Sequence, residues 1–286
     1  MITADTKLIG LLGYPLKFTF SPRMFNETFK TLNMDYFYIP IEVENDKLET
    51  VVNGIRCMNY AGFNVTKPCK VKILDYLDEL DDLAEKIGSV NVVVNKGGRL
   101  KGYNTDGIGF VQALLDETGM DLSRNTFLIF GAGGASMALS STLAYHGVRK
   151  LYILDKFDAA SSTLVKNINN KIRECAEFIA FDNAPVRQLI RKSSVLVNAS
   201  GIGMDPYRGQ SPVDKKYLYK DLFVYELAYN PPRTQLLLDA EEAGCRFMNG
   251  IGMAIHQGVK GFALMTGMPE PNEIMRDAMY RLFGGM

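Results

Sequence analysis

The sequence predicts an α/β protein of two domains, and three observations support this prediction. At 286 residues the chain exceeds the usual size of a single domain. Apolar runs with the length of buried strands alternate with stretches of helical spacing along most of the chain. Between Thr126 and Asp155, a strand, a glycine-rich turn, a helix, a second strand and an acidic residue follow one another.

Strands and helices already alternate before Thr126, which indicates an α/β first domain. Ser21 is expected at the N-cap of the first helix, with Pro22 at its first position. The expected strands are 7–13, 36–41, 61–66, 90–94 and 100–103, the expected helices are 21–32, 47–58, 71–77, 81–87 and 104–115, and a hairpin-type turn is expected at 95–99.

The stretch from Thr126 to Asp155 has the order of a dinucleotide-binding βαβ unit. Gly131 permits the tight turn, and Gly133 lets the backbone approach a pyrophosphate. The helix that follows offers free N–H groups to those phosphates. Asp155 comes near the spacing of about 20 residues expected of an acid that binds ribose hydroxyls. An ordinary βα turn is the alternative, but the flanking strands and the acid favour a Rossmann-type, doubly wound nucleotide-binding domain.

The second domain continues with the same alternation. Further strands are expected at 177–181, 194–199, 222–225 and 246–249, with helices around 164–168, over 234–243 and from 250 onward as the final helix. Polar residues follow three of the strands, at 66–70, 198–204 and 229–230, and such sheets bind ligands at the carboxyl ends of their strands.

The composition excludes several classes of function. Basic and acidic residues balance at 32 each without a long basic block, so nucleic-acid binding is not expected, while a small anionic substrate stays open. The four cysteines form no C-x-x-C pair and only two histidines exist, so neither a disulfide framework nor a metal site is expected. The N-terminal residues lack a signal-peptide pattern and no apolar run approaches a membrane span, so we expect a cytoplasmic protein without membrane association.

Five polar residues are candidates for chemistry, and each also has a purely structural explanation. Lys70 follows a proline-containing turn, where lysines are usually solvated, and Asp106 starts a helix, where an N-cap role is common. Ser21 would serve as a cap, and Gln257 could face solvent. Asn91 lies within an apolar strand, and a buried amide there requires partners.

Combined with a nucleotide site, these residues suggest an oxidoreductase. Oxidation of an alcohol by a nicotinamide cofactor needs a group that accepts the hydroxyl proton as the hydride leaves. Because histidines are scarce, lysine, aspartate or tyrosine must supply that group. A lysine held by a neighbouring aspartate meets the need, so Lys70 and Asp106 could act as a pair.

A set of short motifs extends over essentially the whole chain. They are Gly13–Pro15, Ser21-Pro22, Asn64–Lys70, Gly88–Asn91, Gly102–Gly107, Gly131–Ala135, Asn198–Ser200, Tyr229–Pro231, Gly250–Met253 and Gln257-Gly258. With this pattern the chain resembles the shikimate dehydrogenase family, and more closely its shikimate/quinate dehydrogenase branch. The Asn-Val-Thr-x-Pro-x-Lys and Asn-Thr-Asp-Gly pieces are the most specific parts of the resemblance.

The resemblance implies a role for each candidate residue. Lys70 and Asp106 would form the catalytic dyad, with Lys70 relaying the proton, and Thr19 and Ser21 would hold the substrate carboxylate. The residues that bind the ring hydroxyls would be Thr66, Asn91, Asp106, Tyr229 and Gln257. The residues around the cofactor would be Gly131, Ala132, Gly133, Gly134, Ala135, Asp155, Lys156, Phe157, Asp158, Ser200, Leu227 and Gly250.

The architecture of the family implies a discontinuous substrate-binding domain, residues 1–104 plus 252–286, and a nucleotide-binding domain, residues 105–251. The active site would lie in the cleft between the two domains. The implied activity is reversible hydride transfer between a nicotinamide cofactor and a ring hydroxyl of quinate or shikimate. The protein would be a monomer or a homodimer, serving either aromatic amino-acid biosynthesis or quinate breakdown.

Departures from the family pattern affect the expected substrate. Residues 18–22 are Phe-Thr-Phe-Ser-Pro where the family usually has His-Ser-x-Ser-Pro, and Phe25 replaces a later histidine. Thr19 adds a methyl group that narrows the carboxylate site, so shikimate, quinate and a related cyclohexane carboxylate all stay open. Cys69, before the lysine, is also unusual.

Asp155 favours NAD over NADP, because a carboxylate at the strand end suits ribose hydroxyls and repels a 2′-phosphate. Lys156 opposes this argument, since it could reach such a phosphate, and NADP therefore stays possible. Two other functions remain as alternatives: the same fold acting on a different hydroxy or amino-substituted acid, and a non-catalytic NAD(P)-binding metabolite sensor. The sensor is disfavoured because it needs no proton relay.

Overall fold

The computed structural model describes residues 2–17, 19–182 and 184–282, and the chain divides into two compact units. Unit 1 comprises residues 1–109 and 255–286, and unit 2 comprises residues 110–254. The chain passes from unit 1 to unit 2 within α5 (Asp106–Thr118) and returns within α10 (Ile251–Thr266). Both divisions fall a few residues after the positions expected from the sequence, which were the starts of these two helices.

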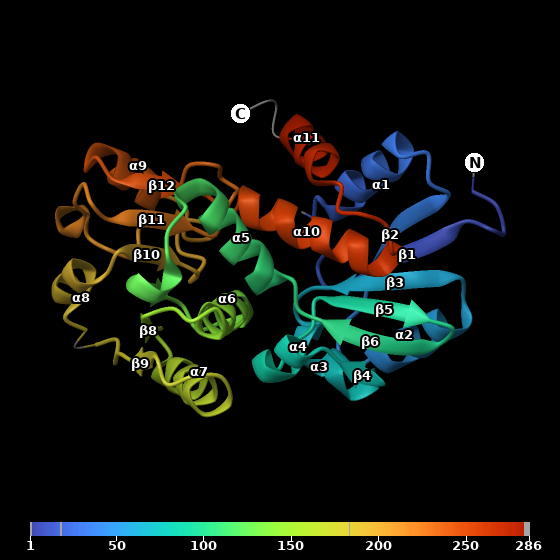
Figure 1. Cartoon of the computed structure of the whole chain (residues 1–286), viewed down its shortest axis with the longest axis horizontal. Coiled ribbons are helices and arrows are strands. Elements are labelled where there is room, and N and C mark those ends of the chain that lie inside the picture. The colour runs from blue at the N-terminus through green and yellow to red at the C-terminus, as the bar shows by residue number, and fades with distance from the viewer. Residues whose placement is uncertain (1, 18, 183, 283–286) are drawn as a thin grey trace. The chain divides into compact units, whose positions relative to one another are not determined.

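Unit 1 is built around a six-stranded mixed sheet with the order β2-β1-β3-β5-β6-β4 (Figure 1). Its strands are β1 (Lys7–Gly13), β2 (Tyr36–Glu42), β3 (Tyr60–Val65), β4 (Glu79–Leu80), β5 (Val92–Lys96) and β6 (Arg99–Tyr103). Strand β1 pairs in parallel with β2 and β3, whereas β5 runs antiparallel to β3 and β6. The predicted hairpin therefore joins β5 to β6.

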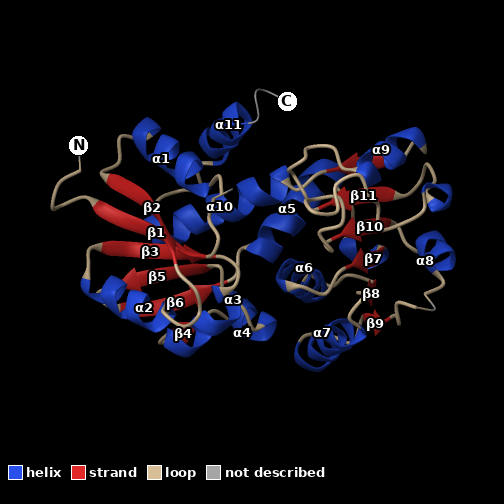
Figure 2. Cartoon of the chain, turned by 180° about the vertical axis from the view of Figure 1, so that it is seen from behind, coloured by secondary structure: helices blue, strands red, loops and turns tan. Residues whose placement is uncertain are grey.

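Helices cover both faces of this sheet (Figures 1 and 2). On one face, Phe63 and Val65 of β3 pack with α2 (Leu48–Cys57), α3 (Cys69–Lys72) and α4 (Asp82–Ile87). On the other face lie α1 (Ser21–Thr31), α10 and α11 (Asn272–Leu282), where Phe29 stacks on Phe262 with ring centroids 5.7 Å apart. Successive side chains of β3 point to opposite faces of the sheet, and nearly all of them are buried, so the strand is covered on both faces.

Unit 2 contains a parallel sheet with the order β12-β11-β10-β7-β8-β9. The strands are β7 (Thr126–Phe130), β8 (Lys150–Leu154), β9 (Ala176–Phe178), β10 (Val195–Asn198), β11 (Phe223–Glu226) and β12 (Arg246–Met248). The chain winds outward from β7 in one direction and then from β10 in the other, which is the doubly wound order of Rossmann-type domains. The predicted fold class is confirmed.

Two apolar clusters fill the faces of this sheet. Phe127 and Ile129 pack with α5, α6 (Gly134–Tyr145) and α7 (Asp158–Lys171). Leu128 and Phe130 pack instead with α8 (Val186–Lys192) and α9 (Gln235–Glu242). Complete burial on both faces explains why these strands have continuous apolar sequences.

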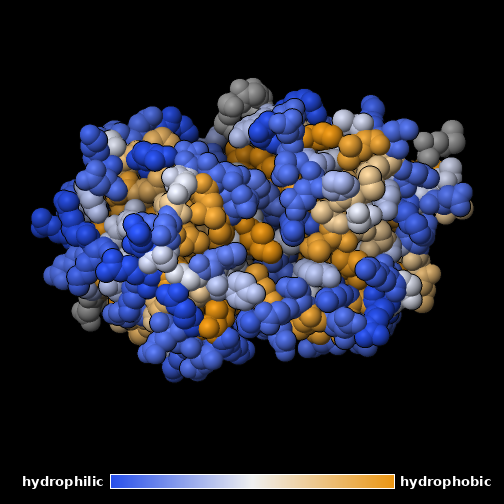
Figure 3. All heavy atoms as spheres, viewed as in Figure 1, coloured by the Kyte–Doolittle hydropathy of each residue, from blue (hydrophilic) through white to orange (hydrophobic). Residues whose placement is uncertain are grey.

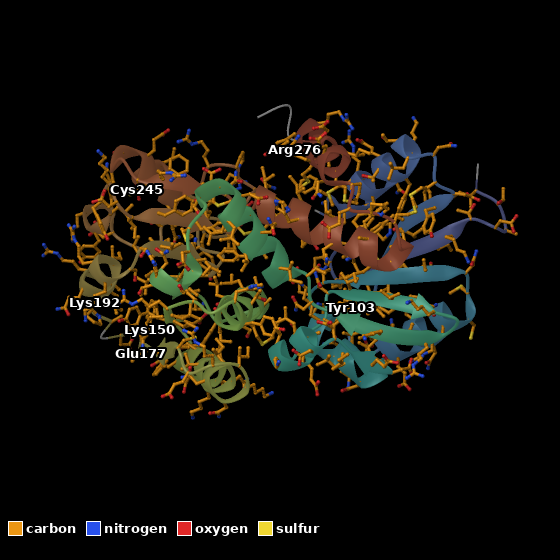
Figure 4. All side chains as sticks on the ribbon, viewed as in Figure 1. Tyr103, Lys150, Glu177, Lys192, Cys245 and Arg276 are labelled. Atoms are coloured by element: carbon orange, nitrogen blue, oxygen red, sulfur yellow. The ribbon has the colours of Figure 1, made fainter. Side chains whose placement is uncertain are left out.

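Hydrophilic side chains cover most of the face seen in Figure 3. Some of them tie neighbouring strands together: Lys150 of β8 pairs with Glu177 of β9 at 2.8 Å (Figure 4). Within residues 2–17, 19–182 and 184–282, no helix combines the length and apolarity needed to cross a bilayer. The same described part of the chain holds no group of three or more His, Cys, Asp or Glu side chains suited to a metal ion.

Several element boundaries differ from the predicted ones. Strand β5 begins at Val92 instead of Val90, and β9 spans Ala176–Phe178 instead of 177–181. After β9 the backbone N–H of Phe181 donates to the Asp158 carboxylate at 3.0 Å instead of continuing the sheet. Helices α8 and α11 and the short β4 were not predicted.

Candidate active site

Lys70 and Asp106 form an ion pair in unit 1. Lys70 lies in α3, just after β3, and Asp106 is the first residue of α5. Lys70 Nζ lies 2.5 Å from Asp106 Oδ2, with the side chains 23% and 11% exposed. The pair is thus largely withdrawn from water, and Asp106 does not act as a simple N-cap because its carboxylate turns toward Lys70.

Asn91 holds the second oxygen of this carboxylate. Its Nδ2 donates to Asp106 Oδ1 at 2.8 Å and also approaches Thr105 Oγ1 at 3.0 Å and Gln257 Oε1 at 3.4 Å. Since the amide carries two hydrogens for three acceptors, the long contact to Gln257 is the weakest. The Asn91 Oδ1 atom accepts from the backbone N–H of Thr105 at 2.7 Å. The buried amide therefore fixes the start of α5 and the orientation of Asp106.

A chain of buried hydrogen bonds lies behind Asn91. Tyr38 Oη donates to Asn64 Oδ1 at 2.9 Å, and Asn64 Nδ2 donates to the Asn91 carbonyl at 3.2 Å. The Ser21 hydroxyl bonds to the Tyr38 phenol; burial raises the pKa of Tyr38, and the bond from Ser21 opposes that rise. These contacts connect the start of α1 with the ion pair through side chains of β2, β3 and the segment before β5.

The structure corrects the predicted cap of α1. The helix starts at Ser21 itself, and Phe20 occupies the N-cap without a side-chain hydrogen bond. Ser21 does not cap the helix because it is already the first helical residue. The backbone N–H of Ser21 makes a long hydrogen bond of 3.4 Å to Thr19 Oγ1. The backbone of Ser21 thus lies next to the Thr19 hydroxyl, and the role of the two hydroxyls in holding a carboxylate stays a prediction.

Thr66 and Gln257 complete the predicted substrate residues of unit 1. Thr66 follows β3, and its backbone N–H donates to the Leu12 carbonyl at 2.8 Å. Gln257 lies in α10, where its backbone carbonyl accepts from Thr105 Oγ1 at 3.1 Å. Through Asn91 and Thr105, Gln257 is joined to the ion pair, and it does not simply face solvent.

The departures from the family pattern are explained in part by packing. Phe25 is fully buried, and its ring lies 4.6 Å from that of Tyr38, centroid to centroid. Cys69 is also buried, where its thiol donates to the Val43 carbonyl at 3.5 Å and burial raises its pKa. Cys69 thus acts as a small core residue beneath Lys70. Phe18 lies outside the described residues.

In unit 2 the glycine-rich turn connects β7 to α6. Gly131 has φ of 106°, and a Cβ there would lie 2.6 Å from the Ala199 carbonyl oxygen, so only glycine fits. A Cβ added to Gly133 or Gly134 would meet no atom within 4 Å. Open space therefore lies in front of the N-terminus of α6, where free N–H groups suit the phosphates of a dinucleotide. The residues present fit such a cofactor.

Asp155 lies directly beside this turn. Its Oδ2 accepts from the backbone N–H of Ala132 at 2.7 Å, and Oδ1 accepts from that of Phe157 at 2.9 Å. Each oxygen keeps further acceptor capacity for ribose hydroxyls. Lys156 Nζ lies 4.9 Å from the centroid of the Phe157 ring and 6.0 Å from that of Tyr207.

The remaining candidates of unit 2 lie in the loops after β10 and β11. Ser200 Oγ donates to Asn198 Oδ1 at 2.6 Å, and the backbone N–H of Leu227 donates to the Asn198 carbonyl at 3.0 Å. Tyr229 follows in the second loop, and burial raises its pKa. A Cβ on Gly250 would collide with the Leu227 carbonyl oxygen at 1.9 Å. Ser200, Leu227 and Gly250 are thus brought together, as the turn and Asp155 are.

One polar residue in these loops was missed by the sequence analysis. Glu226 is the last residue of β11 and is only 1% exposed. An acid that directly follows the apolar run 222–225 was the signal that could have singled it out.

Comparison with known proteins identifies the family. The model described as "Shikimate dehydrogenase substrate binding domain" matches residues 11–93, and "Shikimate 5'-dehydrogenase C-terminal domain" matches residues 250–280. The "Shikimate dehydrogenase (NADP(+))" of Alkaliphilus metalliredigens is 40% identical over 277 residues, which are 96% of each chain. The chain belongs to the shikimate dehydrogenase family. The resemblance inferred from the motifs is confirmed at this level.

Two solved structures of the family show how closely the fold is shared. Shikimate 5-dehydrogenase from Listeria monocytogenes, in complex with shikimate and NAD, has a TM-score of 0.90 at 39% identity, covering 96% of this chain and 97% of the other. Quinate dehydrogenase from Corynebacterium glutamicum, in complex with NAD, has a TM-score of 0.89 at 30% identity, covering 96% and 99%. Family members with this fold therefore include enzymes named for either acid.

Proposed function

We propose that the chain is an oxidoreductase that reversibly transfers hydride between a nicotinamide nucleotide and a ring hydroxyl of shikimate or quinate. The observation that carries the proposal is the ion pair of Lys70 and Asp106, 2.5 Å between Nζ and Oδ2, with Asn91 on the other carboxylate oxygen. Membership of a family whose relatives are named shikimate or quinate dehydrogenases supports it.

The proton step is assigned to Lys70. When bound, the nicotinamide supplies the hydride chemistry, accepting or donating the hydride at the substrate carbon. In the direction of oxidation, the amine of Lys70 accepts the hydroxyl proton, and in reduction the ammonium returns it. Asp106 fixes the position of Nζ through the ion pair, while Asn91 holds the other oxygen of the carboxylate.

The neighbouring polar groups are proposed to orient the substrate. The hydroxyls of Thr19 and Ser21 would hold its carboxylate, and Thr66, Asn91 and Gln257 would bind ring hydroxyls. The predicted role of Tyr229, which follows β11 in unit 2, stays a prediction. The threonine methyl at residue 19 is the feature that would distinguish shikimate from quinate or a related cyclohexane carboxylate.

NAD is proposed as the preferred nucleotide, although the curated relative from Alkaliphilus metalliredigens is named for NADP(+). The argument is the fixed position of Asp155, whose two oxygens accept from Ala132 and Phe157 beside the turn. A carboxylate held there accepts ribose hydroxyls and repels a 2′-phosphate. The charge of Lys156 lies against the rings of Phe157 and Tyr207. The structure of the Listeria monocytogenes relative contains NAD.

The first experiment crosses shikimate and quinate with NAD and NADP and measures initial rates of reduced cofactor formation. We expect turnover of at least one acid, with a higher kcat/KM for NAD than for NADP. A faster rate with NADP would contradict the Asp155 argument while leaving the activity in place. No turnover in all four mixtures would overturn the proposed substrate, and nucleotide binding without turnover would favour the sensor alternative.

The second experiment tests Lys70 itself. Lys70→Ala should lower kcat by about 100- to 10,000-fold, the usual contribution of a positioned proton donor or acceptor. The dissociation constant of the nucleotide should stay unchanged. Lys72→Ala is the matched control, because Lys72 lies in the same short helix but forms an exposed pair with Asp75. Near-normal turnover by Lys70→Ala would refute the assigned role.

A further inference from the structure

We propose that Glu226 is a positioning residue for the nucleotide, because its buried carboxylate ties together the loops of unit 2 that carry the proposed cofactor contacts. The inference rests on the proposed function in one respect, namely that unit 2 binds a nicotinamide nucleotide. It assigns Glu226 no contact with the reacting atoms.

Three donors from different segments converge on this carboxylate. Glu226 Oε2 accepts from Asn198 Nδ2 at 2.8 Å and from Thr234 Oγ1 at 2.9 Å, and Oε1 accepts from the backbone N–H of Ala228 at 3.0 Å. Asn198 ends β10 and is paired with Glu226 across the sheet, whereas Thr234 is the N-cap of α9. One side chain thus holds the end of β10, the loop after β11 and the start of the next helix.

Asn198 passes this restraint on to the loop after β10. Its Nδ2 also donates to the Ile202 carbonyl at 2.8 Å, and its Oδ1 accepts from the Ser200 N–H at 3.2 Å and from the Ser200 hydroxyl at 2.6 Å. Every donor and acceptor of this amide is therefore used. Without the carboxylate, one Asn198 hydrogen would lose its partner inside the fold.

The two loops support the other cofactor segments. The segment Ala199–Ser200 lies against Gly131, where an added Cβ would come within 2.6 Å of the Ala199 carbonyl oxygen. On the other side, the Gly250 N–H donates to the Ala228 carbonyl at 3.2 Å, and Leu227 leaves no room for a side chain at Gly250. The glycine-rich turn, Ser200, Leu227 and Gly250 therefore all depend on segments that Glu226 restrains.

Glu226 carries its charge without a cationic partner. It is 1% exposed, and among the described residues its carboxylate is bonded by an amide, a hydroxyl and a backbone N–H. Burial raises the pKa of Glu226 to about 7, an effect that outweighs the opposing hydrogen bonds. A buried acid kept without a counter-charge is costly, and such groups are concentrated at functional sites.

The titratable groups on neighbouring elements are engaged elsewhere. Arg233 pairs with Glu241, and Asp239 accepts from Gln235 Nε2 at 2.8 Å. Tyr229 follows in the same loop with a pKa that burial raises. None of these groups is among the causes of the raised pKa of Glu226. Protonation near neutral pH would therefore act on the carboxylate directly and remove an acceptor from one of the three donors.

The test uses the full chain carrying Glu226→Gln, Glu226→Asp or Asp239→Asn, titrated with NAD by calorimetry in the absence of substrate. Glutamine keeps the size but sets an NH2 group against a donor, so the dissociation constant should rise on the order of tenfold. Aspartate keeps the charge and should recover part of the affinity. Asp239→Asn, a buried acid of α9 outside these loops, should bind as the wild type does.

Three further readouts separate positioning from a general loss of stability. The affinity of the wild type for NAD should weaken as pH falls through about 7, whereas that of Glu226→Gln should stay flat. Amide hydrogen exchange without ligand should accelerate in segments 199–204 and 227–231 of Glu226→Gln and stay unchanged in β7. In turnover, KM for the nucleotide should rise while KM for the acid stays constant.

The outcomes distinguish this inference from the proposed function. Wild-type affinity and wild-type exchange in Glu226→Gln would overturn the inference alone; if that variant does not fold, unchanged affinity in Glu226→Asp across the pH range does so. Nucleotide binding by the wild type without turnover of shikimate or quinate would overturn the proposed function and leave the role of Glu226 in place. No nucleotide binding by the wild type would overturn both.

Discussion

The side-chain amide of Asn91 donates to Asp106 Oδ1 at 2.8 Å, on the oxygen that Lys70 does not use. The carboxylate is therefore held from two directions, by a cation on one oxygen and a buried amide on the other. This arrangement fixes where Lys70 Nζ lies without requiring a further charged group. Asn91 is 3% exposed, so water cannot replace it easily.

Asn91→Ala should lower both activity and stability. The free energy of unfolding should fall by about 1–3 kcal/mol, because Asp106 Oδ1 and the Thr105 N–H lose a buried partner. The kcat should fall at least about tenfold as Lys70 loses its fixed acceptor. Denaturant unfolding and steady-state rates measure the two effects. Asn95→Ala, which removes an amide bonded to the Gly98 N–H at 2.8 Å at the far end of β5, should leave kcat unchanged.

Tyr38→Phe should weaken substrate binding more than turnover. It removes the donor to Asn64 Oδ1 and the acceptor for the Ser21 hydroxyl, which is proposed to hold the substrate carboxylate. We expect KM for the acid to rise several-fold and stability to fall by about 1–2 kcal/mol. Tyr36→Phe, at the partly exposed start of the same strand, serves as the control. An unchanged KM for the acid in Tyr38→Phe would contradict the proposal that Ser21 holds the substrate carboxylate.

Two glycine substitutions in the turn after β7 should have opposite effects on the fold. Gly131→Ala should destabilise unit 2, because φ is 106° and the new Cβ would meet Ala199. Gly134→Ala meets no atom within 4 Å and begins a helix, so thermal unfolding should shift slightly upward. If a dinucleotide uses this open space, Gly134→Ala should nevertheless bind NAD more weakly. Unchanged affinity of Gly134→Ala for NAD would show that the phosphates of the nucleotide do not occupy this space.

Removing the charge of Asp155 or of Lys156, which follow β8, should change the preference between NAD and NADP. Asp155→Asn keeps one oxygen that accepts from the Ala132 or the Phe157 N–H, sets an NH2 group against the other, and removes the repulsion of a 2′-phosphate. The ratio of kcat/KM for NAD to that for NADP should therefore fall. Lys156→Ala should raise KM for NADP and leave KM for NAD nearly unchanged. The reverse pattern would show that Lys156 contacts a group common to both nucleotides.

Glu226 should make the stability of unit 2 depend on pH in an unusual direction. Its folded-state pKa of about 7 lies above the usual value of 4.5, so the folded protein keeps a proton that the unfolded chain releases. Stability should therefore fall as pH rises from about 4.5 to 7 and stay level above that range. Glu226→Gln lacks this dependence, so its melting temperature should improve relative to the wild type between pH 5.5 and pH 8. A constant difference would contradict the raised pKa.

The elements that the sequence predicted well are those with strong local signals. The apolar strand Thr126–Phe130, the glycine-rich turn and Asp155 follow one another in a short stretch, and the structure places the turn beside that acid. Helix α8 was missed because its seven residues contain only two buried positions, Leu189 and Ile190. Helix α11 was missed because the helix from 250 onward was expected to be the final one, whereas the two prolines at 269 and 271 separate it from a further helix.

The contacts between distant side chains could not be predicted from spacing. The sequence suggested that Lys70 and Asp106 could pair, but not that Asn91 would hold the second oxygen. Ser21 followed the local rule for a helix cap, but the helix begins one residue earlier than that rule predicts, with Phe20 at the N-cap. For Glu226, the only signal in the sequence was an acidic residue directly after an apolar run. Its importance depends on Asn198 and Thr234, which reach it through the sheet and the next helix.

The discontinuity of unit 1 has a consequence for how the protein is synthesised. Every strand of unit 2 is complete once the ribosome has passed β12, yet unit 1 still lacks α10 and α11 at that time. Until then Phe29 has no Phe262 to stack on, and Asn91 has no Gln257 beside it. The unit that starts first along the chain is thus the last to be finished. A chain arrested after β12 would contain the whole sheet of unit 2 and the Lys70–Asp106 pair of unit 1, but neither Gln257 nor the helices α10 and α11.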